Sequence, residues 1–163
     1  MSKVAVVTGG TSGIGKQTAL ALKAAGYTVY ELSRRAQGVE GLHHLVADIT
    51  REEMVDAAIG EVLRQEGHID VVVNNAGINI RKPIEEMVKD EWMKMMEVNT
   101  ASVFLATKYV LPVMRKQGGG AIINTSSICG LIGHMNTPEA YTATKGAITL
   151  LTKSVAAPYG KDN

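Results

Sequence analysis

Short apolar runs alternate with longer segments of helical spacing along the whole chain. The runs are rich in β-branched residues, which is typical of strands buried in a parallel sheet. Five such strands are predicted, at residues 3–8, 28–33, 43–47, 69–73 and 121–125. Helical spacing predicts helices at residues 14–25, 50–65, 90–117 (in two pieces) and 138–158. This alternation predicts an α/β fold, a parallel sheet with helices on both faces.

Local signals indicate where some of these elements begin and end. Thr50 with Glu53 three residues later forms the pattern of a capping box, so the second helix is expected to begin there. Gly26 favours the end of the first helix, and Pro158 is expected to stop the last one. In such sheets, ligands bind beyond the carboxyl ends of the strands.

Composition narrows the class of protein. A chain of 163 residues suits one domain, and its net charge of +1 gives no support for nucleic acid or an anionic membrane as partner. The single cysteine, Cys129, excludes an internal disulfide framework and suits a reducing compartment. No signal-peptide layout or membrane-length apolar run is present, so a cytoplasmic protein is expected. The four histidines lack metal-ligand spacing, and no metal site is predicted.

The glycine-rich loop after the first strand, "TGGTSGIGKQT", has the composition of a phosphate-binding loop. A triphosphate loop needs a hydroxyl at position 17, where Gln17 stands, and Thr18 replaces the third glycine of G-x-G-x-x-G. What remains is Gly9-x-x-x-Gly13-x-Gly15. These glycines would permit a tight turn, a close approach to a pyrophosphate and close packing of the helix, whose N-terminus attracts anions. A turn without any ligand stays open as the alternative.

Several motifs resemble those of the short-chain dehydrogenase/reductase family, in the family's order. They are "TGGTSGIG" in the loop, "NNAG" at 74–77, "VN" at 98–99, "SS" at 126–127 and "YTATK" at 141–145. The resemblance implies a Rossmann-like, doubly wound parallel sheet of strand order 3-2-1-4-5, forming one dinucleotide-binding domain over residues 1–163. It also implies hydride transfer between a nicotinamide cofactor and a small carbonyl compound or secondary alcohol, by a homo-oligomer.

The resemblance implies roles for four residues. Tyr141 would exchange a proton with the substrate oxygen, and Lys145 would hold the nicotinamide ribose. These two share a helix face, and an ammonium beside a phenol favours the phenolate. Ser127, or its neighbour Ser126, would hydrogen-bond the reacting carbonyl, and Asn99 would keep a kinked helix beside the lysine. Each residue also has an ordinary alternative, as a turn, surface or mid-helix polar residue.

Cofactor preference is predicted from the end of the second strand. In NAD-preferring relatives an acid stands seven residues beyond the glycine that closes the first helix; here that residue is Ser33, followed by Arg34 and Arg35. A serine removes repulsion of a 2′-phosphate and Arg34 can pair with it, so NADP is predicted over NAD. The arginines could instead be solvated loop charges, and Ser12 offers no second basic anchor.

Asp48 resembles the family acid that bonds the adenine amino group, or it is a turn residue before Thr50. The expected cofactor-binding residues are Gly9, Ser12, Gly13, Ile14, Gly15, Ser33, Arg34, Asp48, Ile49, Asn75, Ala76, Gly77, Tyr141 and Lys145.

The chain ends soon after the Tyr141 helix, where family members continue with further strands and a substrate-covering segment. We therefore expect a truncated member that lacks the family's last strands and leaves the fifth strand at a sheet edge. Two functions follow: an active oxidoreductase, or a dinucleotide-binding module with weak or no catalysis. The sequence does not identify the substrate, the reaction direction or the oligomer number.

Overall fold

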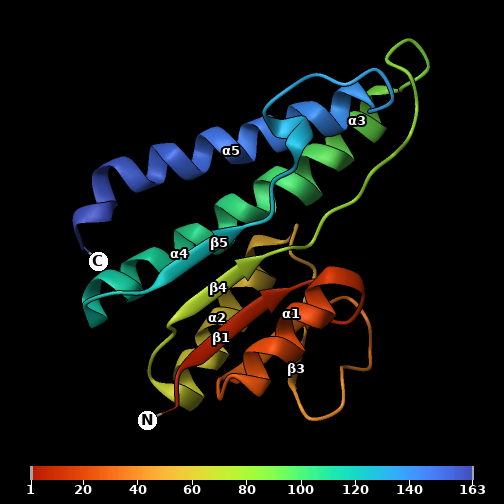
Figure 1. Ribbon diagram of the computed structural model, residues 1–163. Coiled ribbons are helices and arrows are strands. Elements are labelled where there is room, and N and C mark those ends of the chain that lie inside the picture. Colours follow the sequence, from red (N-terminus) through yellow and green to blue (C-terminus); the bar gives the residue numbers. More distant parts are fainter. Residues whose placement is uncertain (1, 163) are drawn as a thin grey trace.

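A five-stranded, fully parallel sheet forms the centre of the computed structural model, which describes residues 2–162 (Figure 1). The strand order is β3-β2-β1-β4-β5, as the sequence predicts. The strands are β1 (Val4–Thr8), β2 (Thr28–Ser33), β3 (His43–Val46), β4 (Val71–Asn74) and β5 (Ala121–Asn124).

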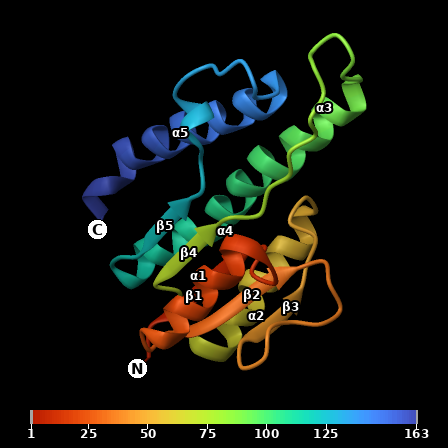
Figure 2. The same cartoon turned by 45° about the vertical axis from the view of Figure 1, so that its right-hand side comes forward.

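Helices cover both faces of this sheet, so the doubly wound arrangement is confirmed. The α-helices are α1 (Gly13–Ala24), α2 (Glu52–Glu66), α3 (Lys89–Met96), α4 (Ser102–Gln117) and α5 (Glu139–Tyr159). Helix α1 lies on one side and α2 and α4 on the other (Figures 1 and 2). Pro158 is the penultimate residue of α5, consistent with its predicted role in ending the helix.

The two faces bury two apolar clusters. Tyr30 and Leu32 of β2 point to the α2–α4 face, where they pack with α2 residues such as Val55 and Val62. Val29 points to the opposite face, where it packs with Ala19 of α1. This alternation is the period of two expected of a strand. It also places Glu31, between Tyr30 and Leu32, on the α1 face.

The long helical stretch divides into two helices, as predicted, and the joint is a π-helical turn. The turn, η1, spans Glu97–Ala101 and contains Asn99, whose side chain is fully buried. A π-helical turn adds one residue to the ordinary helical turn and changes the direction in which the following side chains point. The turn therefore sets the orientation of Asn99 relative to α3 and α4.

The predicted capping box at the start of α2 is wrong. The helix begins at Glu52, and its N-cap is Arg51 without a side-chain cap. The hydroxyl of Thr50 donates instead to Asp48 Oδ1, at 2.7 Å, and the Thr50 amide donates to the same oxygen. Thr50 is therefore held in a turn by Asp48, since a short carboxylate side chain readily bonds the backbone two residues on.

Strand β5 pairs with β4 alone among residues 2–162, so it forms an edge of the sheet, as expected. It runs between α4 and α5 (Figure 1). Within the same residues, none of the helices has both the length and the apolar character that crossing a bilayer requires.

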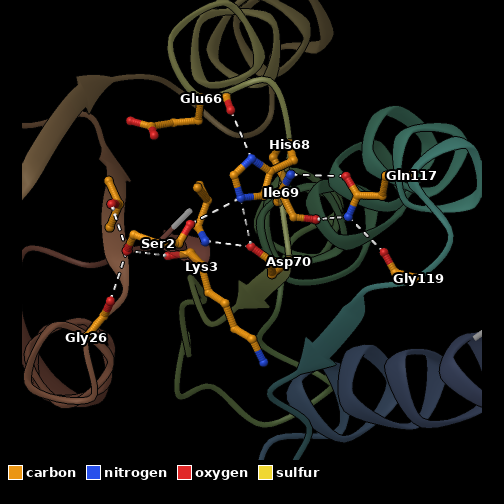
Figure 3. Close-up of polar contacts among 11 residues, drawn as sticks. Ser2, Lys3, Gly26, Glu66, His68, Ile69, Asp70, Gln117 and Gly119 are labelled. Carbon is orange, nitrogen blue, oxygen red and sulfur yellow. Dashed lines mark hydrogen bonds and ion pairs between the residues drawn. The ribbon is translucent and has the colours of Figure 1, made fainter.

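Side chains at the amino ends of the strands join β1 to β4 (Figure 3). Asp70 Oδ2 accepts a hydrogen bond from the Val4 amide at 2.7 Å and lies 3.3 Å from Nε2 of His68. The His68 ring also contacts the carbonyl oxygens of Ser2 and Glu66. These contacts hold the start of β1, the end of α2 and the start of β4 together.

Gln117 fixes the other side of the same region. Its amide oxygen accepts from the Ile69 amide at 3.2 Å, and its nitrogen donates to the carbonyls of Ile69 (2.7 Å) and Gly119 (2.8 Å) (Figure 3). Ile69 is itself fully buried. Gln117 therefore satisfies backbone groups that would otherwise lack partners.

Replacing Gln117 with methionine should remove these bonds while keeping the side-chain length. Because a buried backbone group without a partner costs about 1–3 kcal/mol, Gln117→Met should lower the free energy of unfolding by that amount, measured by urea denaturation. Gln17→Met, at an exposed position of α1, is the control and should change stability by less than about 0.5 kcal/mol. Equal stability of the two variants would contradict this assignment.

Candidate cofactor and active site

The glycine loop between β1 and α1 has the geometry that a bound anion requires. Gly9 has φ of +67° and Gly13 has φ of +54°, conformations that side chains rarely adopt. A Cβ at Gly13 would meet no heavy atom within 4 Å, so the space above this loop is open. A Cβ at Gly15 would overlap the carbonyl of Gly9 and the side chain of Asn75. The loop thus leaves open space beside Gly13, at the N-terminus of α1, where anions are favoured.

The end of β4 is attached to the end of β1 through one hydroxyl. Thr8 Oγ1 accepts hydrogen bonds from the amides of Asn75, at 3.0 Å, and Ala76, at 3.1 Å. The Asn75 side chain donates in turn to the Thr8 carbonyl. The two loops at the carboxyl end of the sheet therefore form one rigid unit.

A cleft of about 670 Å³ lies at this end of the sheet. Ten of the fourteen residues expected to bind cofactor line it: Gly9, Ser12, Ile14, Ser33, Arg34, Asp48, Ile49, Asn75, Ala76 and Gly77. Gly13, Gly15, Tyr141 and Lys145 do not line it. The expectations missed seven lining residues: Thr11, Leu32, Arg35, Ala47, Thr50, Ile78 and Val98. Each of these directly flanks a predicted site residue, and this adjacency is the signal that could have found them; Val98 precedes Asn99 in the π-helical turn.

The two arginines after β2 differ in their contacts. The Arg35 amide donates to Ser33 Oγ at 3.2 Å, and Arg35 Nη1 donates to the carbonyl of Thr11 at 3.3 Å. Arg34 also lines the cleft, but its side chain makes no hydrogen bond or ion pair within residues 2–162. All the donors of the Arg34 guanidinium are therefore left for a ligand, whereas Arg35 uses one of its donors within the chain.

Asp48 is a turn residue, one of the two alternatives considered for it, and it also lines the cleft. Burial acts to raise the pKa of Asp48, but hydrogen bonds from Thr50 and the charges of Arg34 and Arg51 outweigh it, so the pKa is lowered. Asp48 is thus an ionised acceptor at neutral pH.

Asn99 makes three hydrogen bonds, to two separate parts of the site. Its Oδ1 accepts from the Ile78 amide at 2.7 Å, and its Nδ2 donates to the Ile78 carbonyl at 2.9 Å and to Thr144 Oγ1 at 3.1 Å. A Cβ at Gly77 would lie 3.3 Å from Asn99 Oδ1 and 3.8 Å from Lys145 Nζ. Asn99, Gly77 and Lys145 are therefore neighbours, although they lie far apart in the chain.

Lys145 is 4% exposed, and its ammonium donates to the carbonyl of Thr125 at 2.6 Å. The nitrogen lies 5.6 Å from the centroid of the Tyr141 ring. Burial lowers the pKa of Lys145 below its ordinary value near 10.5. The two residues therefore share one helix face, as the spacing predicts.

The two serines after β5 face different groups. Ser126 Oγ bonds the Lys145 carbonyl at 2.9 Å and Thr149 Oγ1 at 2.7 Å, so it fastens β5 to α5. Ser127 Oγ accepts from the Cys129 amide, at 3.2 Å, and its hydroxyl also bonds the Cys129 thiol, which contributes to lowering the pKa of that thiol. The Tyr141 hydroxyl makes no hydrogen bond in the part of the chain that the structure describes. The Tyr141 hydroxyl is therefore the group of this pair that is left to bind a substrate oxygen.

The loop between β5 and α5 presents apolar side chains. Ile128 is 69% exposed, Leu131 is 70% exposed and Met135 is 94% exposed. Ile132 adds a fourth exposed apolar side chain. This segment directly follows Ser127 in the chain.

The family model described as short chain dehydrogenase matches residues 3–163. The cyclopentanol dehydrogenase of Comamonas testosteroni is 40% identical over 94% of this chain and 66% of its own length. The 3-oxoacyl-[acyl-carrier-protein] reductase FabG of Thermotoga maritima is 34% identical over 94% of this chain and 67% of its own length. The chain thus spans about two thirds of the length of these relatives.

Solved structures agree closely with the fold. The structure described as ElxO with NADP bound has a TM-score of 0.94 and 34% identity, covering 99% of this chain and 70% of that one. The aldohexose dehydrogenase of Thermoplasma acidophilum has a TM-score of 0.92 and 35% identity, covering 97% of this chain and 62% of that one. Nearly the whole chain therefore corresponds to about two thirds of each of these proteins.

The lowered pKa of Lys145 predicts a pH dependence of stability. Above the folded-state pKa the native chain releases this proton, while the unfolded chain keeps it until about pH 10.4. The unfolded state then binds more protons, so the Lys145 contribution to stability rises as pH increases through this window. Relative to wild type, Lys145→Met should lose this rise in urea denaturation between pH 7 and pH 10.

Lys153→Met, at an exposed position of the same helix, should retain the rise and serves as the control. If Lys145→Met and Lys153→Met show the same pH dependence, the buried ammonium is not its source.

Proposed function

This chain belongs to the short-chain dehydrogenase family, and we propose that it transfers hydride between a nicotinamide cofactor and a carbonyl compound or secondary alcohol. The described residues would act as one dinucleotide-binding domain. One observation carries the proposal: an open anion-binding loop and a Tyr141–Lys145 pair belong to the same carboxyl-terminal region of one sheet. This is where α/β sheets bind their ligands.

The residues around the cleft fit a dinucleotide. The amides of Ser12, Gly13 and Ile14, at the positive end of α1, would hold the pyrophosphate. The open space above Gly13 supports this fit. Asp48 would accept a hydrogen bond from the adenine amino group, and Ile49 would pack against the adenine ring. The bound cofactor would supply or take up the hydride.

Tyr141 would donate a proton to the carbonyl oxygen of the substrate, or accept one from an alcohol. The free hydroxyl of Tyr141 and the ammonium of Lys145 beside its ring support this role. Ser127 would donate a hydrogen bond to the same oxygen. Asn99 would hold Ile78 and Thr144 so that the lysine keeps its orientation.

We assign NADP as the favoured cofactor, with NAD as the alternative. No carboxylate stands at Ser33 to repel a 2′-phosphate, and Arg34 lines the cleft with free donors. A guanidinium binds phosphate through two parallel hydrogen bonds.

An apolar substrate without charge fits the exposed side chains of Ile128, Leu131 and Met135. Desolvating a charged group against them would be unfavourable. Cyclopentanone and cyclopentanol are suitable first probes, since a relative that is 40% identical is a cyclopentanol dehydrogenase.

Tyr141→Phe should lower the rate of ketone reduction at least about 100-fold, the scale of general acid catalysis. NADPH binding, followed by fluorescence, should change less than about twofold, because the phenol ring remains. Tyr159→Phe, on the same helix, is the matched control and should keep full activity.

A second candidate, cofactor binding without catalysis, is favoured by the fact that Tyr141 and Ser127 do not line the cleft. It predicts that the wild-type chain binds NADPH but turns over no ketone. Turnover that depends on Tyr141 would exclude this candidate, and failure to bind either dinucleotide would overturn both.

Arg34→Ala should weaken NADPH binding about 10- to 100-fold and leave NADH binding unchanged, because a hydrogen bond to a charged group contributes about 1.5–3 kcal/mol. Isothermal titration with each cofactor measures this. Arg64→Ala, at the far end of α2, should alter neither affinity. Equal weakening of both cofactors by Arg34→Ala would contradict a role at the 2′-phosphate.

A further inference from the structure

A carboxylate is buried next to the cofactor cleft, at a position where it would not contact the cofactor. Glu31 of β2 is 0% exposed and shares the α1 face of the sheet with Val29. It pairs in register with His44 of β3. Ionisable side chains are rarely buried without a partner, so the contacts of Glu31 indicate what it does.

His44 connects Glu31 to the loop that carries the arginines. Its Nδ1 lies 2.7 Å from Glu31 Oε1, and its Nε2 lies 2.9 Å from the carbonyl oxygen of Arg35. A carbonyl can only accept, so Nε2 is the donor of this bond. The His44 side chain is 15% exposed: its bond to Glu31 is part-buried, whereas its bond to the Arg35 carbonyl lies at the surface.

The same carboxylate holds two backbone segments. The Val39 amide donates to Glu31 Oε1 at 3.2 Å. A Cβ at Gly38 would lie 2.6 Å from that oxygen and would overlap His44, and a Cβ at Gly10 would lie 2.5 Å from Glu31 Cβ. The glycine loop and the loop after β2 are thus both pressed against Glu31.

This arrangement is not optimal for stability. Glu31 Oε2 is buried and has no hydrogen-bond partner in the part of the chain described. An unpartnered buried polar atom is unfavourable, and apolar residues of similar volume are often as stable as a buried charged pair. What an apolar pair could not do is bind Arg35 and Val39 at defined points.

These contacts fix the backbone on the carboxyl side of Arg34. Arg35 is held through its amide by Ser33, through its carbonyl by His44 and through its side chain by Thr11. On the amino side, Arg34 follows the last residue of β2 directly. The side chain of Arg34 remains the unbonded part of this segment, and it lines the cleft.

We propose that Glu31 and His44 are positioning residues that hold the 34–39 loop so that Arg34 meets the 2′-phosphate of NADP. They touch neither cofactor nor substrate, and they determine cofactor choice through the Arg35 carbonyl and the Val39 amide. The proposal rests on the proposed function, and in particular on the binding of the 2′-phosphate by Arg34.

The test compares cofactor affinities of Glu31→Leu, His44→Leu and the double variant with wild type. Each variant should weaken NADPH binding about tenfold and change NADH binding less than about twofold, measured by isothermal titration. A purely structural role would weaken both cofactors equally. The control is His43→Leu, whose ring stacks on Tyr30 on the opposite face and should leave both affinities unchanged.

Folding is checked separately. Each single variant leaves one buried polar group without its partner and should lower the melting temperature. The double variant should recover much of this loss, because neither polar group remains. Amide hydrogen exchange without cofactor should show faster exchange at Val39 in Glu31→Leu. Loss of NADPH preference in a stable double variant would support the positioning role directly.

Three results would overturn the inference, and they are distinguishable. If the wild-type chain binds neither dinucleotide, both the proposed function and this inference are wrong. If the wild-type chain prefers NADH, the oxidoreductase proposal still stands, but the proposed binding of the 2′-phosphate by Arg34 is wrong. If the wild-type chain prefers NADPH and the double variant keeps this preference, only the positioning role of Glu31 and His44 is wrong.

Discussion

The arrangement of the site depends on one buried amide, the side chain of Asn99. Both its oxygen and its nitrogen are bonded, to the backbone after β4 and to α5, in an interior where an unpartnered amide would be strongly unfavourable. The packing of the three elements seen here satisfies it. The π-helical turn supplies the extra residue that points Asn99 inward, so an irregular helix is the condition for a well-defined site.

The sequence predicts most of the framework because its signals are local and strong. β-branched runs between glycines specify five strands, and all five form within one to two residues of the predicted ends. The glycine loop is equally predictable from the sequence, because the positive φ of Gly9 and Gly13 and the tight contact at Gly15 each require glycine. Ten of the expected cofactor residues line one cleft because parallel strands end at one edge.

What the sequence does not predict depends on which of several available partners a polar group binds. Thr50 has the pattern of an N-cap, but the carboxylate of Asp48 takes its hydroxyl first. The spacing to Tyr141 favours Ser127 over Ser126, but it does not predict that Ser126 bonds the backbone and Thr149 of α5. Glu31 and His44 belong to no motif. They meet because β2 and β3 are adjacent in a particular register, which no short pattern encodes.

That register has a consequence for how the two adjacent histidines are told apart. His43 and His44 are chemically the same, and a shift of one residue along β3 would exchange them between the faces of the sheet. The same shift would carry Leu45 out of the apolar cluster that it packs against on the α2–α4 side. The burial of Leu45 therefore selects which imidazole reaches the carboxylate. A hydrocarbon contact on one side of the sheet thus decides the identity of a polar pair on the other.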